Sequence, residues 1–354
     1  MAPEAELLPR LRDILYGGQV TEGESVYEFE RRFGDLVGQT NVLSFYSGTA
    51  ALHTALILAG VGSGDDVVST AMTAEPSNMS IRHAGGRIVW ADVDPRNGNL
   101  TAATIEASIT PRTRAVLVVH YGGIPAPMAS IRLIAERQGI PVIEDAAHAL
   151  GARYGGVPLG AHSAFVMYSL QAVKHLNTID GGMLVCRAAA DVDRGRLIRW
   201  FGIDRRAPRT SVDVATVGYK YHMNNVTATI GLVQLNHIRA VLDRHVQNGR
   251  FFDRVLEGVP GLQRCVWDAN SEPSYWFYTL LAERRDDLSR ALTDRGIENG
   301  LVHRRNDMHP VFADSRRELP GLDGFWRRML HIPCGWWVTD EEREHIAATI
   351  RKGW

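Results

Sequence analysis

The sequence predicts an α/β protein with a mostly parallel sheet between helix layers and a smaller C-terminal α/β domain. The chain has 354 residues, more than the roughly 100 to 200 of an ordinary domain. Between about residues 49 and 186, short apolar runs alternate with segments of helical period. Nearly continuous apolar strands are buried on both faces, which is typical of parallel sheets covered by helices.

The expected elements follow in chain order. Two segments are the clearest helices, TAALHTALILAGV (49–61) and PMASIRLIAERQG (127–139). The strand candidates are VVST (67–70), RIVWADV (87–93), RAVLVVHY (114–121), PVIEDAA (141–147), AFVMYSL (164–170) and GMLVC (182–186). Ligands of such sheets bind at the carboxyl ends of the strands.

The C-terminal part of the chain predicts a second, smaller domain. Residues 231–259 indicate a long helical connector. Beyond it, SYWFYTLL (274–281), DDLSRALTDRG (286–296) and EEREHIAATIRKG (341–353) suggest a smaller α/β module. We therefore expect a large domain at 1–240, with its N-terminal segment packing near the small domain, and a small domain at 241–354.

Composition excludes several classes of protein. The formal net charge is −1, and arginines are scattered among acids, so nothing indicates a nucleic-acid surface. No apolar run approaches the ~20 residues that span a bilayer, and the first residues lack the uncharged core of a signal peptide. The three cysteines are far apart and match neither a disulfide framework nor a metal motif. We expect a cytoplasmic protein without a metal site.

Lysine is rare in this chain and therefore informative. The sequence has 39 lysines and arginines, but lysine occurs only at Lys174, Lys220 and Lys352. Arginine stays protonated in proteins, whereas a desolvated lysine can become a neutral amine nucleophile. Lys174 follows a predicted strand and precedes a Gly-Gly turn. Its alternative interpretation is a solvated charge in a loop.

Three further features lie at predicted strand or helix ends. Ser47-Gly48-Thr49 opens a helix, whose free N–H groups either bind phosphate or form a plain N-cap. Asp145 ends a strand, with His148 one turn further on, and Ser169 ends the next strand. Together, a phosphate cradle, a carboxylate and a lysine match the three contacts needed by pyridoxal 5'-phosphate (PLP): phosphate, ring nitrogen and aldehyde.

These residues resemble a known family, the DegT/DnrJ/StrS nucleotide-sugar aminotransferases, which are PLP enzymes of fold type I. The likeness runs through GGQVTEGESVYEFERRF, SGTAAL, ITPRTRAVLVVHYGG, VIEDAAHALGARYGG, SLQAVKHLNTIDGG and RGIENGLVH, nearly the whole chain. By that resemblance Lys174 is the Schiff-base lysine and Asp145 the partner of the ring nitrogen. It further implies that Gly48, Thr49 and Ser169 contact the phosphate and that His148 lies near the ring hydroxyl.

The resemblance also implies a homodimer with shared active sites. Members commonly add a residue to the partner's phosphate site from a segment that here is GYKYHMNN, so Lys220 is the residue expected to reach across. The alternative is a solvated Lys220.

Three positions depart from the family pattern. Thr73 stands where an aromatic ring often lies against the cofactor, and Gln171 replaces a frequent histidine. HRRND (303–307) replaces a frequent His-Tyr pair. We expect His303, Arg304 and Arg305 to contact substrate, since guanidinium groups bind carboxylate or phosphate in a two-point fork; the alternative is a basic turn paired with Asp307.

The implied activity is transfer of an amino group from an amino acid to a keto sugar carried on a nucleotide, and L-glutamate is the donor we expect. The cofactor alternates between PLP and pyridoxamine phosphate. The implied setting is amino-sugar biosynthesis for antibiotics, O-antigens or cell-surface glycans. One alternative is a pyridoxamine-dependent deoxysugar dehydratase, which has histidine in place of the lysine, and His175 lies next to Lys174. A keto-cyclitol or keto-octulosonate acceptor, and a PLP-binding regulator without turnover, are the others.

Overall fold

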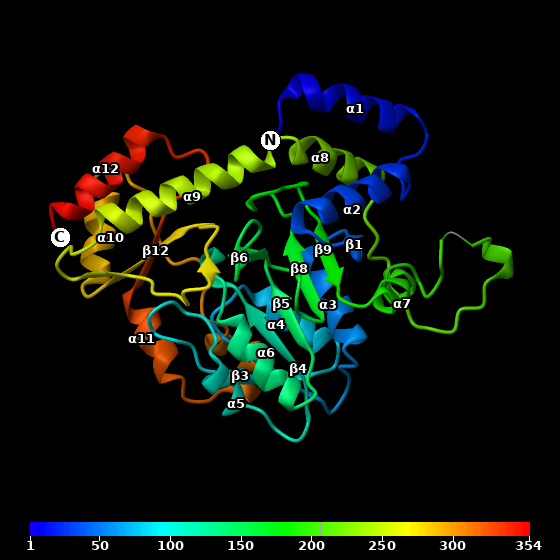
Figure 1. Cartoon of the computed structure of the whole chain (residues 1–354), viewed down its shortest axis with the longest axis horizontal. Helices are drawn as coiled ribbons and strands as arrows, with labels where there is room; N and C mark the ends of the chain where they lie inside the picture. The colour runs from blue at the N-terminus through cyan, green and yellow to red at the C-terminus, as the bar shows by residue number, and fades with distance from the viewer. Residues whose placement is uncertain (206) are drawn as a thin grey trace.

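A seven-stranded sheet forms the centre of the computed structural model, which describes residues 1–205 and 207–354 (Figure 1). Across the sheet the strands are β1 (Val42–Phe45), β9 (Gly182–Cys186), β8 (Phe165–Ser169), β5 (Val142–Asp145), β4 (Thr113–Val119), β2 (Asp66–Thr70) and β3 (Arg87–Ala91). β9 runs antiparallel to both its neighbours, and the other pairs are parallel. The predicted α/β class with a mostly parallel sheet is confirmed.

Each of the six predicted strand segments overlaps one strand of this sheet, and every residue of β2, β5 and β9 is buried. The edge strand β1 was not predicted. It has four residues and pairs antiparallel with β9, so it does not belong to a strand–helix–strand repeat.

Helices cover this sheet. They are α2 (Glu24–Val37), α3 (Gly48–Leu58), α4 (Glu75–His83), α5 (Ala102–Glu106), α6 (Met128–Arg137) and α7 (Ala189–Arg199). The predicted helices at 49–61 and 127–139 correspond to α3 and α6. α3 is buried almost all round, and it packs against β1, β8 and β9 and against helices α4 and α7.

The predicted helical connector is two helices. α8 (Asn225–Leu235) ends before a short turn, and α9 (Ile238–Val255) then runs toward the C-terminal part of the molecule (Figure 1). The N-terminal helix α1 (Glu4–Tyr16) lies on α8, where Leu7 packs against Ile230 and Val233.

A smaller sheet organises the C-terminal part of the chain. It is antiparallel, in the order β10 (Leu262–Arg264), β12 (Tyr278–Ala282) and β13 (Met329–Ile332). Helices α10 (Arg285–Thr293) and α12 (Asp340–Arg351) share with it, and with α9, a separate hydrophobic cluster. No helix in the described part of the chain is long and apolar enough to cross a membrane.

Part of the C-terminal region returns to the large core. Phe312, in the 3-10 helix Pro310–Ser315, and Phe325, in α11 (Pro320–Arg328), belong to the main hydrophobic cluster. β11 (Ser271–Glu272) pairs with β6 (Arg153–Tyr154), which also pairs with β7 (Val157–Pro158). The boundary near residue 240 stays a prediction, because these segments cross between the two sheets. The crossing brings small-domain side chains to the ends of the large sheet.

Candidate active site

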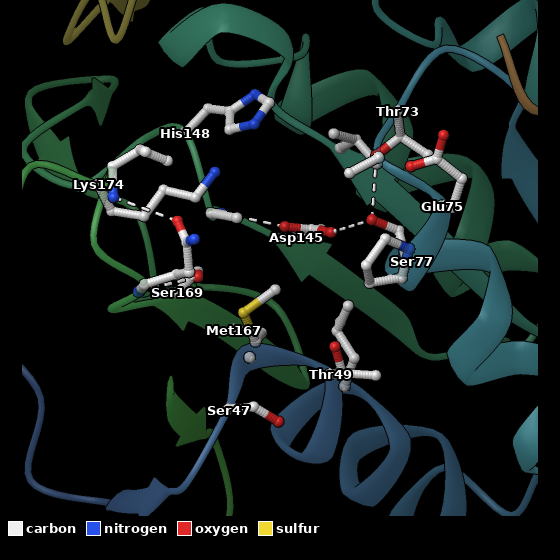
Figure 2. A pocket seen from close by; sticks show the side chains of 18 of the residues that line it. Ser47, Thr49, Thr73, Glu75, Ser77, Asp145, His148, Met167, Ser169 and Lys174 are labelled. Carbon is white, nitrogen blue, oxygen red and sulfur yellow. Dashed lines mark hydrogen bonds between the residues drawn. The ribbon is translucent and has the colours of Figure 1, made fainter. Parts of the chain in front are cut away.

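A cavity of about 500 Å³ lies at the carboxyl ends of β4, β5 and β8, a size suited to a small-molecule site. The N-terminus of α3 and the segment leading into α4 form part of its wall, and Trp276 and His303 come from the C-terminal part of the chain. Figure 2 shows Lys174, Asp145 and His148 around the same space, with Ser47 and Thr49 at the end of the helix below.

The N-terminus of α3 packs closely against the end of β8 at Gly48. Ser47 caps the helix by accepting a hydrogen bond from the Ala50 N–H at 3.1 Å. A Cβ on Gly48 would lie 3.1 Å from the Met167 sulfur and 3.3 Å from the Ser169 Cβ, so only glycine fits without displacement. The first N–H groups of a helix lack intrahelical acceptors and lie at the positive end of its dipole. Gly48, Thr49 and Ser169 thus meet where an anion such as phosphate can bind.

Asp145 is held by two donors at the end of β5. The Ser77 hydroxyl donates to one carboxylate oxygen at 2.6 Å, and the Ala147 N–H donates to the other at 3.0 Å. Thr73 in turn lies within hydrogen-bond distance of Ser77, at 3.0 Å between the hydroxyl oxygens. Burial raises the pKa of Asp145, although these hydrogen bonds and the nearby Lys174 oppose the rise. A cationic N–H placed against this carboxylate would relieve the cost of burying its charge.

Ser77 was missed from the sequence. The segment AMTAEPSN drew attention because of Thr73 and an absent aromatic ring, but the structure shows Thr73 and Ser77 as successive members of a hydrogen-bonded chain that ends on Asp145. Both side chains are buried. Serines at helix starts are common caps, so the sequence carried no signal that separated Ser77 from them.

Lys174 lies in the loop after β8, and its side chain extends into the cavity (Figure 2). Burial lowers the pKa of Lys174 to about 8, while the charge of Asp145 acts in the opposite direction. A sizeable fraction of the amine is therefore neutral near physiological pH, the form that attacks an aldehyde. The neighbouring His175 is buried, packs against His245 and is not among the described residues that line the cavity.

Three rings stack along one wall. The ring centroids of His148 and Trp276 are 3.9 Å apart with planes 19° from parallel, and His303 stacks on His148 at 5.3 Å. The Nε2 atoms of the two histidines are 3.3 Å apart. Burial depresses the pKa of His148 strongly and that of His303 to about 4, so both rings are neutral at pH 7.

Trp276 was also missed. In the sequence it lay in SYWFYTLL, taken only as part of a small α/β module; β12 begins at Tyr278, and Trp276 precedes it in an irregular segment. His303 was predicted as a substrate contact and does line the cavity. Its backbone φ of 65° lies in the left-handed region, which is strained for a residue with a Cβ.

Three other predicted residues lie away from the cavity of their own chain. Lys220 is exposed, beside a surface hollow lined by Tyr46 and His222, and Arg304 is exposed as well. Arg305 is buried and donates to both oxygens of Asp307, at 2.8 and 2.7 Å, and also to Asp323. The predicted role of Arg305 in gripping substrate is corrected accordingly, because its guanidinium is occupied by two carboxylates; pairing with Asp307 was the alternative.

The residues present fit PLP. Gly48 begins α3 directly beside Ser169, and Asp145 offers a buried carboxylate with an elevated pKa. Lys174 supplies an amine, and His148 has a buried Nδ1 without a hydrogen-bond partner among the described residues. Fold and site together define a PLP-dependent aminotransferase of fold type I.

Comparison with known proteins identifies the family. The profile of the DegT/DnrJ/EryC1/StrS aminotransferase family matches residues 2–351. The chain belongs to this family, and its cofactor is PLP.

Solved structures match over nearly their whole length. The sugar aminotransferase CalS13 from Micromonospora echinospora has 38% sequence identity and a TM-score of 0.96, with 100% of this chain and 98% of that chain covered. AtS13 from Actinomadura melliaura has 40% identity and a TM-score of 0.96, with 100% and 96% covered. DesV from S. venezuelae has 28% identity and a TM-score of 0.92, with 98% and 94% covered.

Proposed function

We propose that the protein transfers an amino group from L-glutamate to a keto sugar carried on a nucleotide, with Lys174 as the catalytic amine. The observation that carries this proposal is the meeting of Lys174, Asp145 and the N-terminus of α3 around one cavity. The sugar acceptor is favoured by the similarity to CalS13, a sugar aminotransferase. The biosynthetic setting we propose is the formation of an amino sugar for an antibiotic or a surface glycan.

PLP supplies an aldehyde that binds the amino group and a ring that accepts electrons from the adjacent carbon. With PLP bound, Asp145 would keep a proton on the ring nitrogen, and Ser77 fixes the orientation of its carboxylate. The Nζ of Lys174 would take the proton from the α-carbon of glutamate as a general base and return it, as a general acid, to the cofactor carbon that keeps the amino group; with the acceptor it would move a proton in the opposite direction. Gly48, Thr49 and Ser169 would hold the phosphate.

Lys220 and the protruding segment that precedes it support a shared site. Phe201, Val214 and Val217, which belong to the stretch between α7 and α8, expose 43%, 60% and 78% of their surface. A loop of this stretch extends from the body (Figure 1). Exposed apolar side chains beside such a loop favour burial against a second copy of the chain. We propose a homodimer in which Lys220 reaches the phosphate site of the partner.

Mixing two inactive variants tests this dimer. Lys174→Ala and Lys220→Ala proteins, refolded together, should regain part of the turnover, because each hybrid dimer contains one intact site. Full activity in a monomer, measured by sedimentation together with an assay, would contradict the shared site.

The rival dehydratase needs histidine in the place of the catalytic lysine. Lys174 lines the cavity, whereas His175 packs against His245, so the geometry favours the aminotransferase. The three cysteines are buried and free, which suits the reducing cytoplasm that we propose as the compartment.

Formation of 2-oxoglutarate tests the proposed reaction. The purified enzyme, incubated with glutamate and a panel of nucleotide-linked keto sugars, keto-cyclitols and keto-octulosonates, should release 2-oxoglutarate catalytically with one class of acceptor. The Lys174→Ala variant is the control. A regulator without turnover would give no 2-oxoglutarate even in the single half-reaction with glutamate, and a dehydratase would consume its sugar without consuming glutamate.

A further inference from the structure

Trp276 is held in place by an unusually close backbone crossing. Residues 274–276 run against Gly122 and Gly123: the Ser274 N–H donates to the Gly123 carbonyl at 3.0 Å and the Trp276 N–H to the Gly122 carbonyl at 3.1 Å. A Cβ on Gly123 would lie 2.8 Å from the His148 carbonyl oxygen, and φ is +88° there, so this approach requires glycine. Tyr275 has a left-handed φ of 51°, a conformation that persists only where the surroundings impose it.

The indole of Trp276 is fixed as firmly as its backbone. Its ring N–H donates to the carbonyl of Val173 at 2.9 Å, directly before Lys174 in the chain. The imidazole ring of His148 stacks on the indole ring. The tryptophan from the small-domain side is therefore tied to the loop that carries the lysine.

The amine of Lys174 rests on this indole. Nζ lies 3.8 Å from the ring centroid, well inside the ~6 Å within which an ammonium is attracted by an aromatic face. Among the described residues, no hydrogen bond or ion pair is found for Nζ. The indole face is thus a defined contact of the free amine in this cavity.

We propose that Trp276 is a positioning residue that docks the ε-amine of Lys174 whenever the amine is not bonded to the cofactor. This inference rests on the proposed role of Lys174. In each half-reaction the lysine is released, acts on a proton and must return, although its four-carbon stem is flexible. Docking on a rigid face keeps the amine within reach of the reacting carbon, which preserves the advantage of proximity.

The docking face favours the ammonium form, whereas burial favours the neutral amine. Removing the face should therefore lower the pKa of Lys174. A smaller side chain at position 276 would also admit water, and hydration raises the pKa of a buried lysine. The two effects have opposite signs, so a lower pKa of Lys174 in the variant can be assigned to the loss of the aromatic face. The charges that act on Lys174 or respond to it are those of Asp145, His148, His175 and His303, and all four groups are present in every variant. Glu75 and Asp180 also line the cavity and are likewise unchanged.

The test is a titration of Lys174 in enzyme loaded with pyridoxamine 5'-phosphate, which has no aldehyde and leaves the lysine free. The rate of acetylation of Lys174 by acetic anhydride is measured against pH by mass spectrometry. In Trp276→Leu the midpoint should fall by about 0.5 to 1.5 pH units relative to wild type. Trp276→Phe, which keeps a ring face but loses the N–H bond to Val173, should lie between the two. Trp336→Leu, an exposed tryptophan, is the matched control and should match wild type.

An unchanged or raised midpoint in Trp276→Leu would overturn the proposal. If that variant does not fold, Trp276→Met provides the same comparison, because it fills the position without a ring. Failure of the proposed function is a separate outcome. If the proposed function is wrong, borohydride does not attach cofactor to Lys174 in the wild-type enzyme. If only the docking proposal is wrong, that attachment is intact, but the midpoint of Lys174 in Trp276→Leu is not lower than in wild type.

Discussion

The two walls of the cavity are built differently. The sheet-side wall consists of Asp145, Ser169 and the start of α3, which lie at strand and helix ends of one continuous core. The small-domain wall, Trp276 and His303, comes from irregular segments, with a left-handed residue at His303 and another directly before Trp276. The sheet-side wall can be predicted from local sequence. The small-domain wall forms only because the chain crosses back between the two sheets.

Replacing Asp145 by Asn tests the sheet-side wall and should have the largest effect. The variant removes a buried charge that would face a cationic ring nitrogen. Losing one partner of a buried pair costs about 3–5 kcal/mol, so kcat/KM for the glutamate half-reaction should fall by a factor of about 10² to 10⁴. Asp180→Asn, an exposed carboxylate on the same cavity, is the matched control. Equal kinetics in the two variants would remove Asp145 from the mechanism.

Arg304 and Arg305, which follow His303 in the chain but do not line the cavity, sharpen the comparison on the small-domain side. Arg305→Ala leaves the carboxylates of Asp307 and Asp323 without their buried partner, so the free energy of unfolding should fall by about 3 kcal/mol. Exposed Arg304→Ala should change it by less than about 0.5 kcal/mol. Denaturant unfolding gives both values. A tenfold rise in KM only in the Arg304 variant would assign that residue to substrate, whereas equal stability losses would contradict the structural role of Arg305.

The small-domain side should also make the fold sensitive to acid. Burial lowers the pKa of His245 to about 4 and that of His331 to about 3. Below the unfolded pKa of ~6.5 the unfolded chain binds protons that the native state refuses, so stability falls as pH falls. At pH 5 each histidine should cost up to about 2 kcal/mol relative to pH 7. Thermal unfolding at both values checks this; a Tm that is unchanged would contradict it.

Ser77→Ala should give the smallest effect. It removes one donor to Asp145 and leaves the Ala147 N–H, which predicts a loss in kcat/KM of roughly tenfold, the size of one hydrogen bond to a charged group. Ser80→Ala, a buried serine of the same helix that bonds only backbone carbonyls, is the control. A Ser77 variant with wild-type kinetics would show that the hydroxyl does not orient Asp145.

Local sequence predicted the central strands because each is a short apolar run between turn or helix signals. β1 escaped because Val42–Phe45 is an edge strand of four residues outside the repeat. The connector read as one helix, since the turn at Asn236 and His237 carries no proline or glycine. Trp276 could not be found as a site residue, because its place depends on Gly122 and Gly123, more than a hundred residues earlier in the chain.

Arg305 shows the same limit from the opposite direction. Two adjacent arginines look equivalent in sequence, but one is exposed and the other is enclosed by Asp307 and, from α11, Asp323. Asp323 is too far from Arg305 in the chain for a local sequence pattern to predict their ion pair. Residues at the ends of regular elements are therefore the ones that sequence identifies best here.

Reduction of the holoenzyme with borohydride tests the central claim most directly. The reagent fixes the cofactor to whichever lysine carries it, and the chain offers only Lys174, Lys220 and Lys352. Peptide mapping by mass spectrometry should find the cofactor on Lys174 alone, and the Lys174→Ala protein should acquire none. Cofactor attached to Lys220 or Lys352, with Lys174 unmodified, would contradict the account.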